Sequence, residues 1–122
     1  MDYKKQFGVF ISEKRKDQSY SISELAGLLG ITKAYLSQLE NGIRCNPSSA
    51  LLLLLSKELH LDSENTAIMY RLYSKASGRV SPDIAEYVLN NACVEYAIRL
   101  ALDKNAGEQE WMKFVEILND RS

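Results

Sequence analysis

The spacing of apolar residues restricts the fold of this chain more than any other feature. Along almost its whole length these residues recur at intervals of three and four, which is the period of an α-helix that buries one face. Alternating β-branched residues are scarce, and prolines occur only at positions 47 and 82. The pattern therefore predicts an all-α protein, with helix breaks near residues 19, 30, 42–47, 62, 78–82, 91 and 105–107.

Residues that start and end helices divide this pattern into segments. Ser21, followed three positions later by Glu24, has the spacing of a capping box, and Gly30 can adopt the left-handed conformation that ends a helix. Four further helices are expected to begin at caps, namely Thr32, Ser48, Ser63 and Ser81, the last followed by Pro82 at the first helical position. The predicted helices span residues of about 4–16, 21–29, 33–41, 48–60, 63–76, 82–88, 92–104 and 108–118.

Two groups of these helices differ in how they should be buried. The helix over residues 48–60 is apolar nearly all round, so it should be the central and most buried one. The last two helices have a single apolar face, which is expected to point inward. The residues on that face are Val94, Ala97, Ile98, Ala101, Leu102, Trp111, Phe114, Val115 and Leu118.

Composition excludes several classes of protein. No apolar run approaches the roughly 18 residues of a membrane span, and the N-terminus lacks the apolar core of a signal peptide, so we expect a cytoplasmic protein with no membrane contact. Cys45 and Cys93 are too few for a disulfide scaffold or a zinc cage, and His60 has no partner at metal-ligand spacing. No catalytic arrangement of side chains is evident, and we expect no cofactor, no metal and no enzymatic activity.

The stretch from Ser21 to Gly42 carries the functional information. It predicts two short helices joined by a tight turn at residues 30–32, with the small Ala26 where the helices must come close and the apolar Ile31 inside the turn. Leu36 and Leu39 would hold the second helix against the first. This geometry leaves one face of the second helix free, and a protruding helix fits the major groove of duplex DNA.

The order of these elements resembles the helix-turn-helix of the Xre family, also called the Cro/CI-like repressors. The resemblance covers residues of about 7–61. The matching residues are Ile11, Arg15, Leu25-Ala26, Leu29-Gly30-Ile31-Thr32, Leu36-Ser37, Leu39-Glu40-Asn41-Gly42 and Pro47-Ser48. It implies a five-helix Cro/CI-like DNA-binding head followed by a C-terminal helical extension. We place the helix-turn-helix domain at residues 1–62 and the extension at residues 63–122.

The resemblance also implies roles for individual side chains. The helix over residues 33–40 would be the recognition helix, with base contacts from Lys33, Ala34, Ser37 and Gln38. Contacts to phosphates, or flanking positions, are implied for Ser21, Ser23, Thr32, Tyr35, Asn41 and Arg44. Each assignment has a plainer alternative, in which the side chain is a solvated, packing or capping residue with no part in binding.

Arg15 and Glu40 stand where the family carries an internal ion pair between the first and third helices. The resemblance therefore implies a structural pair that holds the recognition helix in place. Two features depart from the family pattern. Ile22 stands where many members have a phosphate-binding Gln. The loop over residues 43–46 is one residue longer than is usual in the family, which leaves the placement of Arg44 open.

The extension over residues 63–122 exceeds what the head needs. Its strong apolar stripes must pack on the same chain or on a second one, so Tyr70, Tyr73, Trp111 and Phe114 are candidates for either the core or a dimer interface. Xre proteins with a helical extension commonly dimerise through it. The expected partners are double-stranded operator DNA and a second copy of the chain, with another protein on residues 63–122 as a possible third.

These observations predict a sequence-specific transcriptional regulator, a repressor that binds a palindromic operator as a homodimer. The alternative is an antitoxin or immunity-type regulator whose extension binds a partner protein, with autoregulatory DNA binding. The net charge of −1 does not exclude DNA, because it is unevenly distributed. Residues 1–47 hold seven Lys and Arg against five Asp and Glu, and the remainder holds eight against eleven. A mildly basic reading head and an acidic body are expected.

Overall fold

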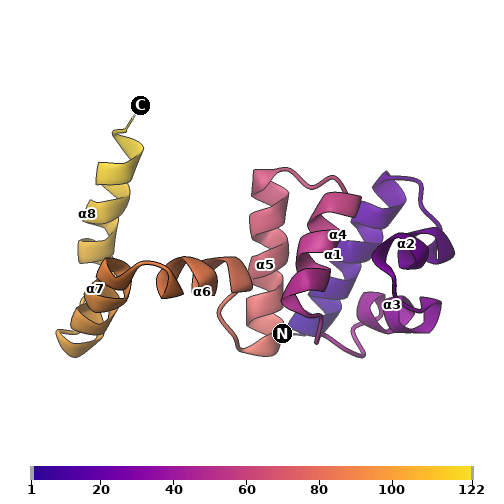
Figure 1. The fold of residues 1–122 in the computed structure, drawn as a ribbon, viewed down its shortest axis with the longest axis horizontal. Coiled ribbons are helices and arrows are strands. Elements are labelled where there is room, and N and C mark those ends of the chain that lie inside the picture. The colour runs from indigo at the N-terminus through magenta and orange to yellow at the C-terminus, as the bar shows by residue number, and fades with distance from the viewer. Residues whose placement is uncertain (1, 122) are drawn as a thin grey trace. The chain divides into compact units, whose positions relative to one another are not determined.

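The computed structural model describes residues 2–121, and within that range the fold is all-α, as predicted. The described residues form eight helices, which Figure 1 labels. They are α1 (Tyr3–Asp17), α2 (Ile22–Leu29), α3 (Lys33–Glu40), α4 (Ser49–Glu58), α5 (Ser63–Ser77), α6 (Pro82–Leu89), α7 (Ala92–Asp103) and α8 (Glu108–Asn119). The observed ends lie within two residues of the predicted ones.

Side-chain caps explain why the helices of the first half begin where they do. The capping box at α2 is confirmed: Ser21 Oγ accepts from the Glu24 N–H, and Glu24 Oε1 accepts from the Ser21 N–H. Thr32 and Ser48 cap α3 and α4 as predicted. The predicted cap at Ser63 is wrong, because the carboxylate of Asp62 accepts the Asn65 N–H at 2.7 Å and Ser63 is the first residue of α5.

The chain divides into two compact units, a head unit up to Pro82 and a tail unit from Asp83 onward. The head unit thus runs twenty residues beyond the expected domain boundary at residue 62. The reason is α5, which packs along α1 (Figure 1) and contributes Met69, Tyr70 and Tyr73 to the buried core. The fifth helix of the expected head is therefore α5.

The core of the head unit lies between α1 and the helices that follow it. Its fully buried side chains come from α1 to α5 and from the residue after α4: Phe7, Ile11, Leu25, Leu36, Leu39, Leu52, Leu55, Leu59 and Met69. Helix α4 contributes buried leucines as expected, but Leu53 is 51% exposed, so this helix is buried on one side only. The α1–α3, α2–α3 and α2–α4 contacts complete the packing of the head unit.

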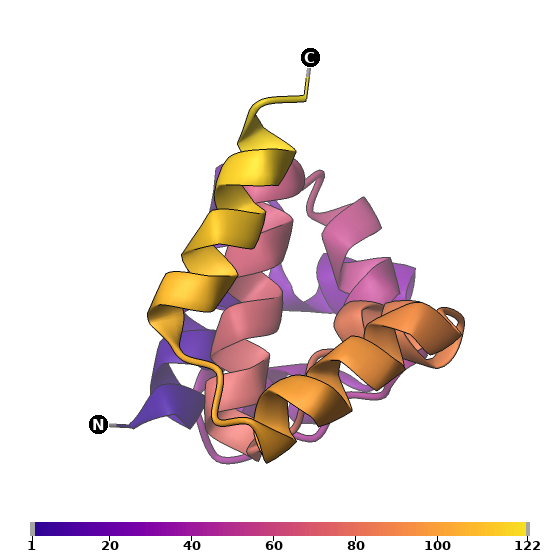
Figure 2. The ribbon, with the colours of Figure 1, turned by 90° about the vertical axis from the view of Figure 1, so that its left-hand side faces the viewer.

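The tail unit has a different character, because none of the described residues of α6, α7 or α8 is buried. The inward orientation expected for the apolar faces of α7 and α8 is therefore wrong: Leu102 is 77% exposed, Phe114 51% and Trp111 41%. Figures 1 and 2 show that α8 diverges from α7 after the turn between them. Between the two helices lies an apolar groove of about 340 Å³, which Leu100, Trp111 and Phe114 help to line.

Two further features concern membrane-spanning helices and metal-binding side chains in the described part of the chain. Among residues 2–121, no helix is long and apolar enough to cross a membrane. In the same range, no group of three or more His, Cys, Asp or Glu side chains is arranged to hold a metal ion.

Candidate nucleic-acid interface

Helices α2 and α3 form a compact two-helix unit around the turn at Gly30. Gly30 has a left-handed φ of 68°, and the N–H of Ile31 donates to the carbonyl of Ala26 at 3.0 Å, which closes the end of α2. Ile31 is half-buried against the core, and Leu36 and Leu39 of α3 are fully buried. The inner face of α3 is thus held by the core, and its opposite face is left toward solvent.

The four residues expected to contact bases share this outer face of α3. Lys33 and Ala34 are exposed, and Ser37 and Gln38, one turn further on, are half-buried. Residues three and four apart are neighbours on a helix surface, so the four side chains form one continuous strip. The strip offers an ammonium, a methyl group, a hydroxyl and an amide, which is a mixed set of donors, acceptors and apolar surface.

Tyr35 joins α3 to the loop that follows it. Its hydroxyl donates to the side-chain carbonyl of Asn46 at 3.1 Å, and Thr32 Oγ1 accepts the Tyr35 N–H at 3.0 Å. Burial raises the pKa of the Tyr35 phenol, and the nearby Arg44 lowers it by a smaller amount. The phenol is therefore protonated at neutral pH and acts as the donor in this contact.

The other residues with predicted phosphate or flanking contacts lie at the two ends of the unit. Ser21 and Ser23 are exposed at the start of α2. The hydrogen bonds of the Ser21 capping box lower the pKa of Glu24. At the end of α3, the Asn41 amide donates to the carbonyl and the hydroxyl of Ser37, at 2.9 and 3.2 Å. Arg44 is exposed in the following loop, with its N–H bonded to the Gln38 carbonyl.

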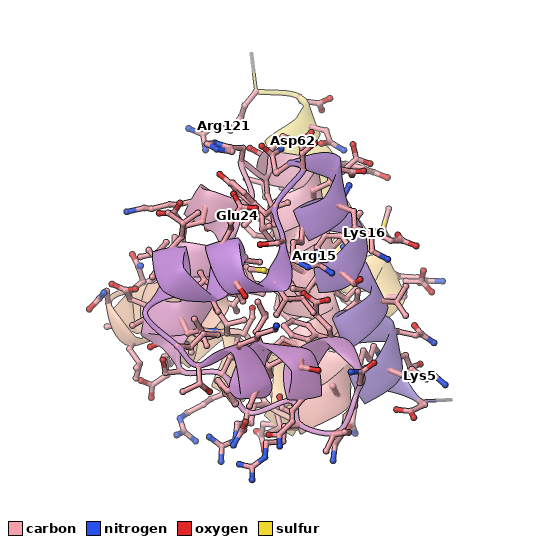
Figure 3. All side chains as sticks on the ribbon, turned by 90° about the vertical axis from the view of Figure 1, so that its right-hand side faces the viewer. Lys5, Arg15, Lys16, Glu24, Asp62 and Arg121 are labelled. Atoms are coloured by element: carbon pink, nitrogen blue, oxygen red, sulfur yellow. The ribbon has the colours of Figure 1, made fainter. Side chains whose placement is uncertain are left out.

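An ion pair between Arg15 and Glu40 connects α1 to the end of α3. Arg15 Nε lies 2.8 Å from Glu40 Oε2 and its Nη2 lies 3.0 Å from Oε1, so the contact is bidentate. A third bond, from Nη1 to the Tyr20 carbonyl at 2.8 Å, reaches the loop before α2. Figure 3 shows Arg15 directed inward from α1 and the adjacent Lys16 directed outward. Both paired residues are buried, and the carboxylate of Glu40 raises the pKa of Arg15.

Two glycines that the sequence did not single out for this purpose let α1 and α3 come close together. A Cβ on Gly8 would meet the carbonyl oxygens of Leu39 and Glu40, and a Cβ on Gly42 would lie 2.7 Å from the Cα of Lys5. Gly42 also has a φ of 72°, a conformation that side chains rarely adopt. Only residues without side chains fit at these two points, so α3 rests directly on the backbone of α1.

Charge distinguishes the two units. The head unit carries eleven Lys and Arg against eight Asp and Glu, a net charge of +3, and the tail unit carries four against eight, a net charge of −4. One of the head's acids, Glu40, is already neutralised by Arg15 in the interior. A surface that binds a polyanion therefore belongs to the head unit and not to the tail unit.

Comparisons with known proteins agree with this geometry. A family model described as helix-turn-helix matches residues 11–64. The HTH-type transcriptional regulator SlrR of Bacillus subtilis (strain 168) is 38% identical over 72 residues, which are 58% of this chain and 47% of that protein. The HTH-type transcriptional regulator SinR of the same organism is 46% identical over 41 residues, which are 34% of this chain and 37% of that protein. This chain therefore spans less than half the length of either relative.

A solved structure of a SinR protein/SinI protein complex is similar over 94% of this chain and 96% of that chain, with a TM-score of 0.47 and 25% identity. The family match covers the capping box of α2, the turn at Gly30, the whole of α3 and both members of the Arg15–Glu40 pair. Residues 11–64 therefore form a helix-turn-helix domain of the Xre, or Cro/CI-like, family.

Proposed function

We propose that the protein is a cytoplasmic transcriptional regulator that binds double-stranded operator DNA with α3 in the major groove. The observation that carries this proposal is the outer face of α3, which is solvent-accessible while its inner face is held by Leu36, Leu39 and the buried Arg15–Glu40 pair. A groove-reading helix must protrude and must also be rigid, because base contacts depend on the placement of single atoms.

The strip on α3 would supply the base contacts. The amide of Gln38 can bond adenine in a bidentate manner, the ammonium of Lys33 can donate to guanine, and the methyl group of Ala34 can pack on a thymine methyl. Ser37 can bond either a donor or an acceptor. Ser37 already accepts a hydrogen bond from Asn41, which holds its hydroxyl oxygen at the edge of the strip.

Phosphate contacts would flank this strip at both ends of the two-helix unit. Ser21, Ser23 and Thr32 lie where the free N–H groups of α2 and α3 begin, and helix N-termini attract phosphate. Asn41 and Arg44 lie beyond the end of α3, where Arg44 is exposed. Tyr35 supports the same loop through its bond to Asn46, so we assign it a positioning role between α3 and the backbone contacts.

We further propose that the tail unit joins two copies into a homodimer that represses from a palindromic operator. Support comes from the exposed apolar side chains of α6 to α8 and from the groove that Trp111 and Phe114 help to line. Tyr70 and Tyr73 are not part of this surface, because both are buried in the head core. A dimer would place two α3 helices on half-sites about 34–36 Å apart and would double the phosphate contacts.

Selection of bound sequences from a random duplex pool, with the full chain at about 50–100 mM salt, tests the proposal. We expect two symmetric half-sites separated by one helical turn or a multiple of it. Gln38→Ala should weaken binding to the selected duplex by roughly tenfold, while the exposed Lys57→Ala on α4 should not. Failure of any sequence to be enriched would contradict DNA recognition, and enrichment of a single asymmetric site would contradict the symmetric dimer.

A second candidate function rests on the same exposed tail. In an antitoxin or immunity-type regulator, a different protein would cover the apolar faces of α7 and α8, and DNA binding would serve autoregulation. Light scattering of the purified chain separates the two functions. A monomer that becomes a one-to-one complex with the product of a neighbouring gene favours this candidate, and a dimer formed without any partner favours the homodimeric repressor.

A further inference from the structure

The head unit contains a basic hollow that none of the assigned contacts uses. Two adjoining pockets, of about 660 and 330 Å³, lie between the start of α1, the loop after α3 and the end of α5. Lys4 and Ala76 line both pockets, Lys75 lines the first, and Arg79 lines the second. We call this surface the basic basin and define it by Lys4, Lys75 and Arg79.

The three cations of the basin have no acidic partner among the described residues. No ion pair within 4.0 Å involves any of them, and all three are exposed. The one carboxylate in the lining is that of Asp2, which already accepts the N–H of Lys5 at 3.1 Å as the cap of α1. Three like charges around a shared hollow repel one another, and an anion bound there would relieve that repulsion.

The position of the basin relates it to α3. Its walls include Gly42 and Ile43 in one pocket and Asn46 in the other, and these residues belong to the loop that follows α3 directly. Asn46 is itself bonded to Tyr35 of α3. The basin is therefore lined in part by the loop that also carries the proposed phosphate contacts Asn41 and Arg44.

We propose that the sugar–phosphate backbone of duplex DNA, next to the half-site read by α3, occupies the basic basin, and that Lys4, Lys75 and Arg79 bind its phosphates. This inference rests on the proposed function. The shape of the site favours an extended polyanion over a compact anion. The two hollows adjoin, and their cations come from α1, from α5 and from the segment after α5. The contact reads no bases, so it adds affinity without adding sequence preference.

Salt dependence of binding by the full chain tests the basin. Fluorescence anisotropy with the selected duplex, measured at several salt concentrations, gives the slope of log K against log salt. Each lost phosphate contact should reduce that slope by about 0.9, so the double variant Lys75→Gln/Arg79→Gln should lose about 1.8 for each occupied half-site. The ratio of affinities for the selected duplex and a mismatched one should be unchanged. Lys57→Gln on α4 removes the same exposed charge outside the basin and should keep the wild-type slope.

The possible outcomes distinguish failure of the basin assignment from failure of the proposed DNA-binding function. A wild-type slope in the double variant, with the effect of Gln38→Ala intact, overturns the basin and leaves α3 as the reading helix. Absence of duplex binding by the wild-type chain at low salt overturns both. If inorganic phosphate raises the melting temperature of the wild type and not of the double variant, while the slopes agree, the basin holds a small anion and the DNA assignment is wrong.

Discussion

A single guanidinium, that of Arg15, connects three segments of the head unit. Its hydrogen bonds reach Glu40 at the end of α3 and the Tyr20 carbonyl before α2, so one side chain sets the relation of α1 to both helices of the helix-turn-helix. The family resemblance located the two charged partners, but the bond to Tyr20 depends on the path of the loop. That contact has no signature in the sequence.

Arg15→Ala should lower the free energy of unfolding by about 3–5 kcal/mol, because it leaves the carboxylate of Glu40 buried without a partner. Urea unfolding followed by circular dichroism would measure the loss. The neighbouring Lys16→Ala removes an exposed charge from the same turn of α1 and should change stability by less than about 0.5 kcal/mol. An Arg15→Ala variant with the wild-type unfolding midpoint would show that the pair does not stabilise the fold.

At the scale of elements, local signals placed the helices well and tertiary contacts explain the exceptions. Ser21, Thr32 and Ser48 were predictable caps, because each precedes an apolar run with the right spacing. The cap of α5 was misplaced by one residue, since Asp62 and Ser63 are both good capping residues and only the geometry distinguishes them. Gly8 in the middle of α1 reads as a weak helix position, and its purpose appears only when α3 is packed against it.

The close approach of α1 and α3 predicts opposite effects for two helical glycines. Gly8→Ala should destabilise the head by about 1–3 kcal/mol, because the new Cβ would push on the carbonyls of Leu39 and Glu40. Gly27→Ala in α2 has nothing within 4 Å of the new Cβ and should stabilise by about 0.4–1 kcal/mol. Thermal unfolding of both variants makes the comparison. Equal and small shifts would mean that α3 does not rest on the backbone of α1.

At the scale of the whole molecule, the sequence was informative for the head and less so for the tail. The helical period identifies which face of α7 or α8 is apolar, but it does not say what covers that face, and the inward orientation was wrong for this reason. The basic basin was equally invisible, because Lys4 lies some seventy residues from Lys75 and Arg79 and only the packing of α5 on α1 brings them together. The roles of the α3 residues remain predictions.

The exposed tail predicts that the full chain is a dimer in solution. Light scattering across a concentration series would give the mass. Phe114→Asp places a charge on the groove between α7 and α8 and should yield monomers, with the melting of the head unchanged. Leu53→Asp on α4 makes the same kind of change at an exposed apolar position of the head unit, outside the tail surface, and should leave the dimer intact. A wild-type chain that stays monomeric at every concentration would contradict the prediction.

The lack of any buried side chain in α6, α7 and α8 has a consequence for how the protein responds to its own abundance. With the dimer that we propose, the order of the tail comes from association, so mass action links its folding to the number of molecules present. Below the dissociation constant of the dimer, occupancy of a two-half-site operator rises with the square of the monomer concentration. A modest change in synthesis or degradation would then produce a steep change in repression, without a ligand and without any change in the head.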